Sequence, residues 1–200
     1  MNLVIDVGNT RTKLAVFDKN NIITVVVVSQ SEVLDGIKEL RKSYSQLHLA
    51  IVSSVGVLDQ AVVNYLNIHF NLLVLSHETP LPFNNLYATP KTLGIDRIAL
   101  VCASVQQFSN KNVLIIDAGT CITYDFITNT NDYLGGSISP GIRMRYHALH
   151  NQTAKLPLLE TQFPEHFIGN STINAINSGI VYGVLSEIDG IIERYSADYS

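Results

Sequence analysis

The apolar and polar positions near the N-terminus first alternate and then change to a helical spacing. Short stretches rich in Val, Ile and Leu, separated by polar breaks, are typical of β-strands. The expected strands are residues 2–7, 12–18 and 22–29. A helix should follow with Ser31 as its cap, because apolar residues then recur every third or fourth position. Its apolar face would consist of Val33, Leu34, Ile37 and Leu40.

Helices and strands are expected to alternate in the middle of the chain. The pattern predicts a strand at 47–53, a helix at 59–68 and a strand at 72–75. The inward side of that helix would consist of Ala61, Val62, Tyr65 and Leu66. Residues 76–94 contain Pro80, Pro82 and Pro90 and should be irregular. A connection of this length in a compact domain is usually functional or mobile.

The second half of the chain repeats the opening of the first. A helix near residues 96–108 leads into further strand-like stretches, and helices close the chain. The expected strands are 113–117, 121–128 and 133–139, and the expected helices are 141–151 and 171–196. This order is typical of a ribonuclease-H-like unit, in which helices cover a mixed sheet. We therefore expect an α/β chain of two such halves, residues 1–95 and 96–200, with a cleft between them.

The same short motif occurs where the first strand of each half ends. An apolar run finishes in an aspartate, a glycine follows two positions later, and a small polar residue comes next. The two copies are Asp6-Val7-Gly8-Asn9-Thr10 and Asp117-Ala118-Gly119-Thr120. A gapless alignment of the copies also pairs Thr12 with Thr123, which suggests two related halves.

Each copy of this motif offers groups that suit a nucleotide triphosphate. A carboxylate can bind a hydrated Mg²⁺ or another cation, and glycine lacks a Cβ, so backbone N–H groups can approach phosphate oxygens closely. Two such turns facing each other across a cleft would hold a polyphosphate from both sides. A single turn of this kind is more often an ordinary hairpin. The repetition favours the nucleotide-binding interpretation.

The composition is that of a globular chain of 200 residues, 46% of them hydrophobic and 15% charged. The net charge is −4 and the Lys and Arg residues form no cluster, so nucleic acid is not expected as a partner. The longest apolar stretch, residues 22–28, is far shorter than the ~20 residues that span a bilayer. Because no secretory signal is visible, we expect a cytoplasmic protein without a membrane segment.

Cysteine and histidine give weaker signals. Cys102 and Cys121 are expected to be buried free thiols, because they lie on helix-like and strand-like segments and outside any zinc-ligand spacing. His147 and His150 can share a helix face, but no carboxylate or thiol near them completes a metal site.

Longer signatures extend the pattern over most of the chain. They are Gly94-Ile95-Asp96-Arg97, Gly135-Gly136-Ser137-Ile138-Ser139-Pro140-Gly141, Thr153-Ala154-Lys155-Leu156-Pro157, and Thr172 with Ala175, Ile176, Gly179 and Gly183. Together with both aspartate motifs, they make the chain resemble the type III pantothenate kinases, members of the acetate and sugar kinase, heat-shock ATPase and actin superfamily. The fold that this resemblance implies is a pair of ribonuclease-H-like, actin-like ATPase halves around a cleft.

The resemblance implies that ATP phosphorylates the primary hydroxyl of pantothenate to 4′-phosphopantothenate, the first step toward coenzyme A. The residues that it assigns to ATP are Asp6, Val7, Gly8, Asn9, Thr10, Arg11, Thr12, Lys13 and Thr120. Lys13 would meet phosphate charge, although a solvated lysine on a strand is the alternative. Asp117 corresponds to the site of a monovalent cation, K⁺ or NH₄⁺, and Mg²⁺ would accompany the nucleotide. The turn at 135–141 would approach the nucleotide, or would be a tight turn only.

Asp96 is the candidate catalytic residue and a substrate contact by the same resemblance. Phosphoryl transfer mainly requires alignment and charge neutralisation, while a carboxylate accepts the hydroxyl proton. The other implied pantothenate contacts are Tyr87, Gly94, Ile95, Arg97 and Thr172. Structural alternatives exist for several of them. Asp96 and Thr172 could cap helices, Arg97 could form a surface ion pair, and Tyr87 could pack within its loop.

The last expected helix is informative about a dimer contact and about the segment that follows it in family members. Gly179 and Gly183 would let another helix approach closely, which fits the homodimer that the resemblance implies. Family members continue beyond such a helix into a strand and a Thr-Gly-Gly turn near the nucleotide. This chain would be a shortened version or would lack its tail, so its second half would lack the last strand and helix.

Two alternative functions are a phosphohydrolase of the same superfamily and a non-catalytic nucleotide-binding regulator. The signature at Gly94–Arg97 disfavours both, because neither function needs that substrate loop. A hydrolase would release phosphate without pantothenate, and a regulator would bind ATP with slow turnover or none.

Overall fold

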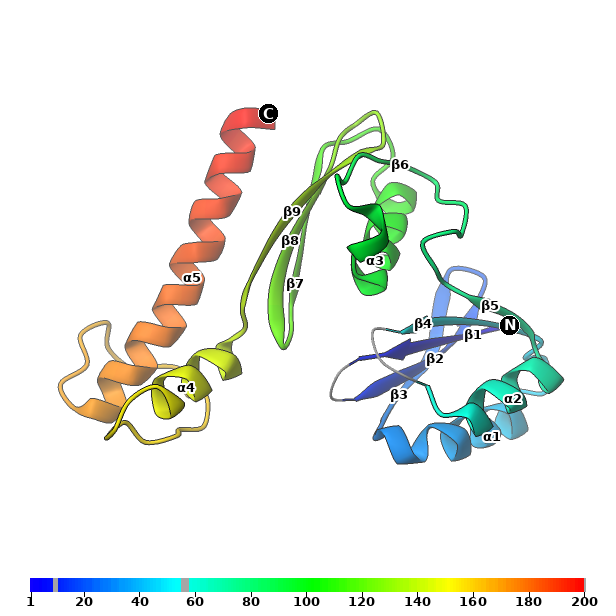
Figure 1. Cartoon of the computed structure of the whole chain (residues 1–200), viewed down its shortest axis with the longest axis horizontal. Helices are drawn as coiled ribbons and strands as arrows, with labels where there is room; N and C mark the ends of the chain where they lie inside the picture. The colour runs from blue at the N-terminus through cyan, green and yellow to red at the C-terminus, as the bar shows by residue number, and fades with distance from the viewer. Residues whose placement is uncertain (9–10, 55–57, 200) are drawn as a thin grey trace. The chain divides into compact units, whose positions relative to one another are not determined.

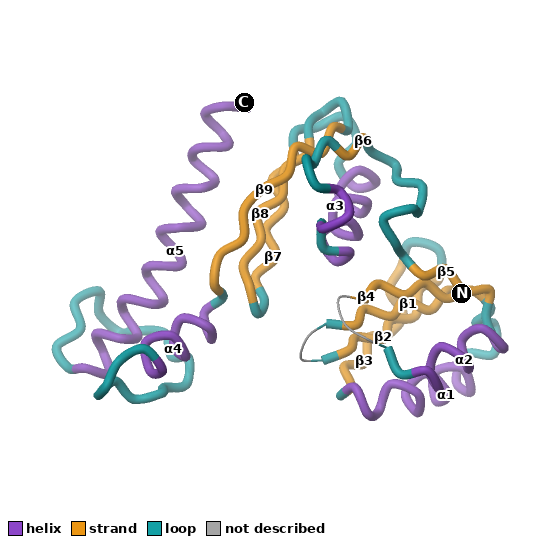
Figure 2. The backbone as a smooth tube through the Cα atoms, viewed as in Figure 1, coloured by secondary structure: helices purple, strands orange, loops and turns teal. Residues whose placement is uncertain are grey.

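A computed structural model describes residues 1–8, 11–54 and 58–199 of the chain. The chain divides into two compact units, whose elements are labelled in Figure 1 and coloured by type in Figure 2. The first unit comprises Met1–Leu81 and Ala88–Cys102, and the second comprises Pro82–Tyr87 and Ala103–Ser200. Each unit contains a mixed sheet with helices, so the predicted α/β class is confirmed.

The first unit is built on a five-stranded sheet. Its strands are β1 (Asn2–Val7), β2 (Thr12–Asp18), β3 (Asn21–Val28), β4 (Leu49–Ser54) and β5 (Asn71–Val74). Its helices are α1 (Val33–Ser43) and α2 (Gln60–His69), with short 3₁₀ turns at Gln30–Glu32 and Pro90–Thr92. The order is β3-β2-β1-β4-β5; β2 runs antiparallel to its neighbours, whereas β4 runs parallel to β1 and β5.

The alternation of side chains along β1 decides which face of this sheet is covered. The buried positions are Leu3, Ile5 and Val7. They form one core with Ile37 of α1 and Leu66 of α2, the two helices that lie along the same face of the sheet in Figure 1. Because successive strand residues point to opposite faces, Asp6 and its cross-strand partner Lys13 lie on the other face.

The second unit is built on a four-stranded sheet with the order β6-β9-β8-β7. Its strands are β6 (Asn84–Asn85), β7 (Val113–Ala118), β8 (Cys121–Ile127) and β9 (Asp132–Pro140). Its helices are α4 (Ile142–Asn151) and α5 (Thr172–Tyr199), whereas α3 (Ile95–Gln107) begins in the first unit and ends in the second. β8 runs antiparallel to both β7 and β9, and β6 runs parallel to β9.

Strand β6 lies inside the segment that was expected to be irregular. The Asn84 N–H donates to Asn131 O at 2.8 Å, and the Leu86 N–H donates to Tyr133 O at 3.0 Å. The Asn84 amide also donates to Asp132 Oδ1 at 2.9 Å. These bonds attach the proline-rich segment to β9, so Tyr87 belongs to the second unit.

Helix α5, with 28 residues, is by length and composition alone long and apolar enough to cross a membrane. The same helix buries several apolar residues inside the second unit. Val184 packs with Ile122 and Tyr124 of β8, and Ile176 and Ile180 pack with Tyr146 of α4. The apolar character of α5 therefore serves, at least in part, to cover the sheet and α4.

Two local expectations about helices are wrong. A 3₁₀ turn capped by Ser29 precedes α1, so the residue at the N-cap of α1 is Glu32 rather than Ser31. The Ser29 N–H donates to the Glu32 carboxylate at 3.0 Å. Ala61 is exposed rather than inward. The Asp59 carboxylate accepts the Ala61 N–H at 2.7 Å, which fixes the start of α2 and turns Ala61 to solvent.

The two aspartate hairpins differ in length. Asp6 pairs with Lys13 in the first, whereas Asp117 pairs with Thr123 in the second. Residues 8–11 connect the last paired positions of the first hairpin, and residues 119–121 connect those of the second. The gapless alignment of Thr12 with Thr123 is therefore wrong, because the shorter connection places Thr123 where Lys13 stands. The antiparallel three-strand opening itself does repeat.

Candidate functional site

The first aspartate hairpin brings a carboxylate and an ammonium group together. Lys13 Nζ lies 3.9 Å from Asp6 Oδ2 across the paired strands β1 and β2. The side chains are 65% and 44% exposed, respectively, so water screens the pair. Exposed pairs of this kind contribute only ~0–1 kcal/mol. Lys13 is therefore held weakly, and its ammonium can turn toward a phosphate oxygen at little cost.

The other residues of this hairpin present mainly backbone groups. The Gly8 N–H donates to Arg11 O at 3.2 Å and closes the turn. Val7 and Thr12 have buried side chains, which line a cavity together with Val33 of α1 and Val62 of α2. The Thr12 hydroxyl has no hydrogen-bond partner among the described residues. The residues assigned to ATP that lie outside the described residues are Asn9 and Thr10.

The second aspartate motif is an exposed turn packed against the start of α4. Asp117, Gly119 and Thr120 are all exposed. The Gly141 N–H donates to Thr120 O at 3.1 Å, and the Gly119 N–H donates to Cys121 O at 2.9 Å. A Cβ on Gly141 would collide with the carbonyl oxygens of Gly119 and Thr120. A glycine at position 141 is therefore required for this close approach.

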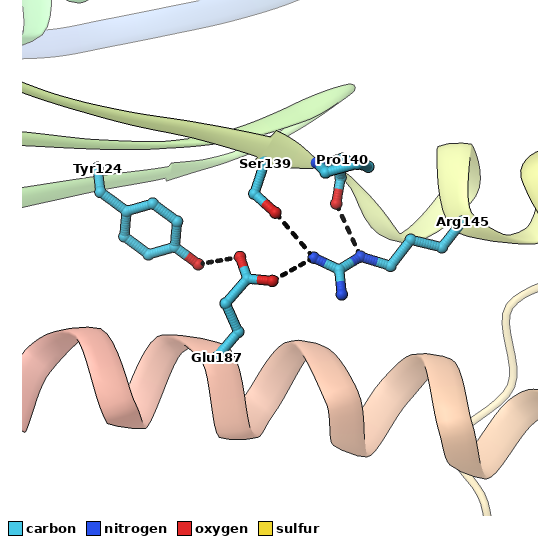
Figure 3. A network of polar contacts seen from close by, with 5 residues as sticks. All are labelled: Tyr124, Ser139, Pro140, Arg145 and Glu187. Atoms are coloured by element: carbon cyan, nitrogen blue, oxygen red, sulfur yellow. Dashed lines mark hydrogen bonds and ion pairs between the residues drawn. The ribbon is translucent and has the colours of Figure 1, made fainter.

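A polar network fixes the end of β9 and the start of α4, as Figure 3 shows. Arg145 of α4 donates from Nε to Pro140 O at 2.9 Å and from Nη2 to Ser139 Oγ at 3.0 Å. The same guanidinium lies 2.5 Å from Glu187 Oε2 of α5, and the Tyr124 hydroxyl donates to Glu187 Oε1 at 2.9 Å. The network thus joins β8, β9, α4 and α5 directly beside Gly141.

The sequence analysis missed this network because its members are far apart in the chain. Arg145 and Glu187 are separated by 42 residues, and Tyr124 and Glu187 by 63. The sequence of α5 offered no clear signal, because Glu187 is one of several charged residues there, with Asp189, Glu193 and Arg194 close by.

Burial and hydrogen bonding shift the pKa values of Tyr124 and Glu187 in this network. Burial, followed by the hydrogen bond to Glu187, raises the pKa of Tyr124 to about 12. Burial also acts to raise the pKa of Glu187. Hydrogen bonds from Arg145, Tyr124 and Ser139, together with the charge of Arg145, outweigh burial, so the pKa of Glu187 is lowered. The carboxylate is therefore the form that the folded chain favours.

Replacing Glu187 by glutamine should destabilise the protein by about 1–3 kcal/mol at neutral pH, because Arg145 loses its counter-charge. The pKa of Glu187 is lowered in the folded state, so its stabilisation is present above the unfolded pKa and disappears as the pH falls through the folded value. Urea unfolding at neutral and acidic pH measures both effects. The exposed Glu193 of α5 supplies the control Glu193→Gln. Equal effects of the two substitutions would contradict the expectation.

Asp96 lies in the first turn of α3, one residue after the helix begins. The Gly94 carbonyl accepts the Ile98 N–H at 3.1 Å, so Gly94 rather than Asp96 occupies the cap position. Asp96 Oδ1 accepts the Arg97 N–H at 2.9 Å. A side chain on Gly94 would collide with this carboxylate oxygen, so the glycine leaves room for the half-buried Asp96.

The remaining candidate substrate contacts differ in exposure. Arg97 is only 5% exposed, so the alternative of a surface ion pair is wrong. Tyr87 is half-buried, with its ring 6.2 Å from that of Tyr133. The Ser171 hydroxyl accepts the Asn174 N–H at 3.2 Å, which makes Ser171 the cap of α5. Thr172 is the exposed residue that follows, and its capping alternative is therefore wrong.

The donor atoms of the second turn suit a hard cation. Asp117 and the neighbouring backbone carbonyls are oxygen donors, the kind that Mg²⁺ and alkali ions prefer to thiols. Within residues 1–8, 11–54 and 58–199, no three His, Cys, Asp or Glu side chains gather as a metal cage. Cys102 and Cys121 are free, as predicted, but half-buried rather than buried; burial raises the pKa of the Cys102 thiol.

Comparison with known proteins gives sequence relatives and a similarity of fold to solved structures. The family model described as type III pantothenate kinase matches residues 2–194. A relative of that description from Flavobacterium johnsoniae is 47% identical over 204 residues, which cover 100% of this chain and 82% of the relative. Another, from Bacteroides fragilis, is 43% identical with the same coverage. A solved structure from Campylobacter jejuni, assigned to the Baf family of transcriptional activators, matches with a TM-score of 0.59 at 22% identity, covering 94% of this chain and 78% of that one. This likeness bears on the fold alone.

Proposed function

The chain belongs to the type III pantothenate kinase family, and from that premise we propose how its residues phosphorylate pantothenate with ATP. The enzyme is a pantothenate kinase, so the products are 4′-phosphopantothenate and ADP. The observation that carries this function is the family match over residues 2–194. Family membership does not favour the alternatives of a phosphohydrolase or a non-catalytic regulator.

Asp96 is proposed as the general base. The pantothenate hydroxyl oxygen forms a bond to the γ-phosphorus while the bond from that phosphorus to the β,γ-bridging oxygen breaks and ADP leaves. The hydroxyl proton passes to a carboxylate oxygen of Asp96 as the new bond forms. Its half-buried position and the room beside Gly94 support this role, because the carboxylate is held by the Arg97 N–H at 2.9 Å.

The two aspartate turns are proposed to bind ATP. The weakly paired ammonium of Lys13 would neutralise phosphate charge, and the backbone at Gly8 would approach phosphate oxygens because it carries no Cβ. Thr120 would donate from its exposed hydroxyl. The roles of Asp6, Asn9, Thr10 and Arg11 stay proposals that rest on the family resemblance.

The proposed cations are Mg²⁺ with the nucleotide and K⁺ or NH₄⁺ at Asp117. The exposed Asp117 carboxylate and the oxygen atoms of its turn fit a cation of this class. When bound, such ions neutralise charge on the phosphates and help to fix the turn. Asp117 keeps the turn negatively charged, and Gly141 holds it against α4.

The proposed pantothenate contacts are Tyr87, Gly94, Ile95, Arg97 and Thr172. Arg97 supplies a guanidinium for the substrate carboxylate or for the developing phosphoryl charge. We also propose a cytoplasmic homodimer. A Cβ on Gly179 or Gly183 would meet no atom within 4 Å, so both positions of α5 are open to another helix.

A coupled ADP-release assay tests the proposed function. ADP formation should depend on pantothenate, on Mg²⁺ and on K⁺ or NH₄⁺. Asp117→Asn should weaken the response to the monovalent cation, because the amide carries no charge to hold the ion. Asp189→Asn, at an exposed aspartate of α5, is the matched control and should respond normally. ADP release without pantothenate, or a normal cation response of Asp117→Asn, would contradict the respective assignments.

A further inference from the structure

Tyr87 lies beside a buried tyrosine and aspartate of the second unit. Its ring centroid is 6.2 Å from that of Tyr133, with 33° between the ring planes. Tyr133 is 0% exposed, and its hydroxyl donates to Asp125 Oδ1 at 2.6 Å. Asp125 is also 0% exposed. Phe83 packs edge-on against the Tyr133 ring at 5.8 Å, so Tyr133 is fixed by an aromatic contact as well as by its hydroxyl.

A β-bulge in β9 places a glycine, which has no side chain, against the Tyr87 ring. Ile127 pairs with Tyr133 and Phe126 pairs with Gly135, so Leu134 is the extra residue of β9. Gly135 has a φ of +104°, which side-chain-bearing residues rarely adopt. A Cβ on Gly135 would lie 3.1 Å from Tyr87 Cδ2 and 3.3 Å from Cε2. The ring therefore packs against Gly135, and an added methyl group would push it away by a few tenths of an ångström.

The backbone next to Tyr87 is attached to the same strand. The Leu86 N–H donates to Tyr133 O at 3.0 Å, and the Tyr87 N–H donates to Asn85 Oδ1 at 3.1 Å. Tyr87 itself is half-buried, so part of its side chain stays accessible to a ligand. The backbone is thus positioned by β6 and β9, and the ring by Gly135 of β9 and by the buried pair behind it.

We propose that Gly135, Tyr133 and Asp125 are positioning residues that orient Tyr87 toward pantothenate. This inference rests on the proposed function, in which Tyr87 contacts that substrate. Orientation matters because a misplacement of ~1 Å can cost on the order of 100-fold in rate. The three residues act through the ring of Tyr87, and Gly135 lies inside β9 rather than in the turn at Gly141. They should therefore affect the vitamin substrate and leave ATP binding unchanged.

A double-mutant cycle between Gly135→Ala and Tyr87→Leu tests this proposal on the full chain. Gly135→Ala should raise the KM for pantothenate roughly tenfold and leave the KM for ATP unchanged. In the Tyr87→Leu background the same methyl group should raise the pantothenate KM much less, because the ring that it displaces is absent and only the backbone strain at the positive φ remains. Gly190→Ala is the matched control, since a Cβ there would meet no atom within 4 Å.

Each outcome of the cycle decides the proposal. Additive increases in the pantothenate KM, or equal increases for ATP and pantothenate, would overturn it. If Tyr87→Leu alone left the pantothenate KM unchanged, Tyr87 would not contact the substrate, and this inference would be overturned. The proposed function would still be upheld if the unaltered protein released ADP only in the presence of pantothenate. If Gly135→Ala does not fold, Tyr133→Phe takes its place; it keeps the ring and removes only the hydroxyl. A pantothenate KM that Tyr133→Phe leaves unchanged would then overturn the proposal.

Discussion

Asp96→Asn should lower kcat by about 10²–10⁴-fold and leave ATP binding intact. The amide oxygen can still accept the Arg97 N–H, so the start of α3 should persist. The amide cannot take the proton of the pantothenate hydroxyl, so the phosphoryl acceptor stays a poor nucleophile. Coupled ADP release at saturating pantothenate measures the loss, and equilibrium binding of an ATP analogue measures what remains.

A matched control separates this chemical effect from the loss of a negative charge at a helix start. Asp35 lies in the first turn of α1, is 81% exposed in its side chain, and pairs with Lys38 at 3.8 Å. Asp35→Asn should cost about 0.3–1 kcal/mol of stability through the helix dipole and leave kcat unchanged. Normal turnover in Asp96→Asn would show that another group accepts the proton.

Gly141→Ala should raise the KM for ATP by about 10–100-fold and destabilise the protein by about 1–3 kcal/mol. The new Cβ would collide with the carbonyl oxygens of Gly119 and Thr120, so either the turn or the start of α4 must move. The hydrogen bond from Gly141 to Thr120, now 3.1 Å, would lengthen or break. Steady-state kinetics with varied ATP and urea unfolding measure the two effects.

Gly190→Ala is the control for this substitution too. Its methyl group meets no atom within 4 Å, and alanine favours a helix over glycine by up to ~1 kcal/mol. The control should therefore be as stable as the unaltered protein or more stable, with an unchanged KM for ATP. If Gly141→Ala behaved like Gly190→Ala, the close packing of the second turn against α4 would have no role in ATP binding.

The longer strands could be predicted because the alternation of apolar and polar residues within each strand is a local pattern. β1 (Asn2–Val7) and β2 (Thr12–Asp18) agree with the expected ranges, since alternation within each strand follows from which face is buried. β6 could not be predicted, because a strand of two asparagines exists only through its hydrogen bonds with β9. The N-cap of α1 was misplaced because a 3₁₀ turn capped by Ser29 precedes the helix and moves its N-cap to Glu32, which a local pattern of serines does not show.

For the candidate site, the sequence indicated residue types and positions but not their surroundings. Asp6 and Lys13 were expected near phosphate, and the register of β1 and β2 places them opposite each other. The burial of Arg97 and of the Thr12 side chain had no local signal. Arg97 carries a charge that usually lies at the surface, so only packing of the folded chain reveals that it is 5% exposed.

The sequence alone determined the family, the α/β order of elements, and the aspartate and glycine at two strand ends, because these depend on periodicity and on side-chain chemistry within a few residues. The tertiary structure alone decided the shorter second hairpin, the contact of Gly141 with Thr120, the Arg145–Glu187 network and the stacking of Tyr87 on Gly135. Each of these joins separate segments or sets the register between strands. These contacts are stabilised by packing and hydrogen bonds that form only in the folded chain. Local propensity does not encode such contacts.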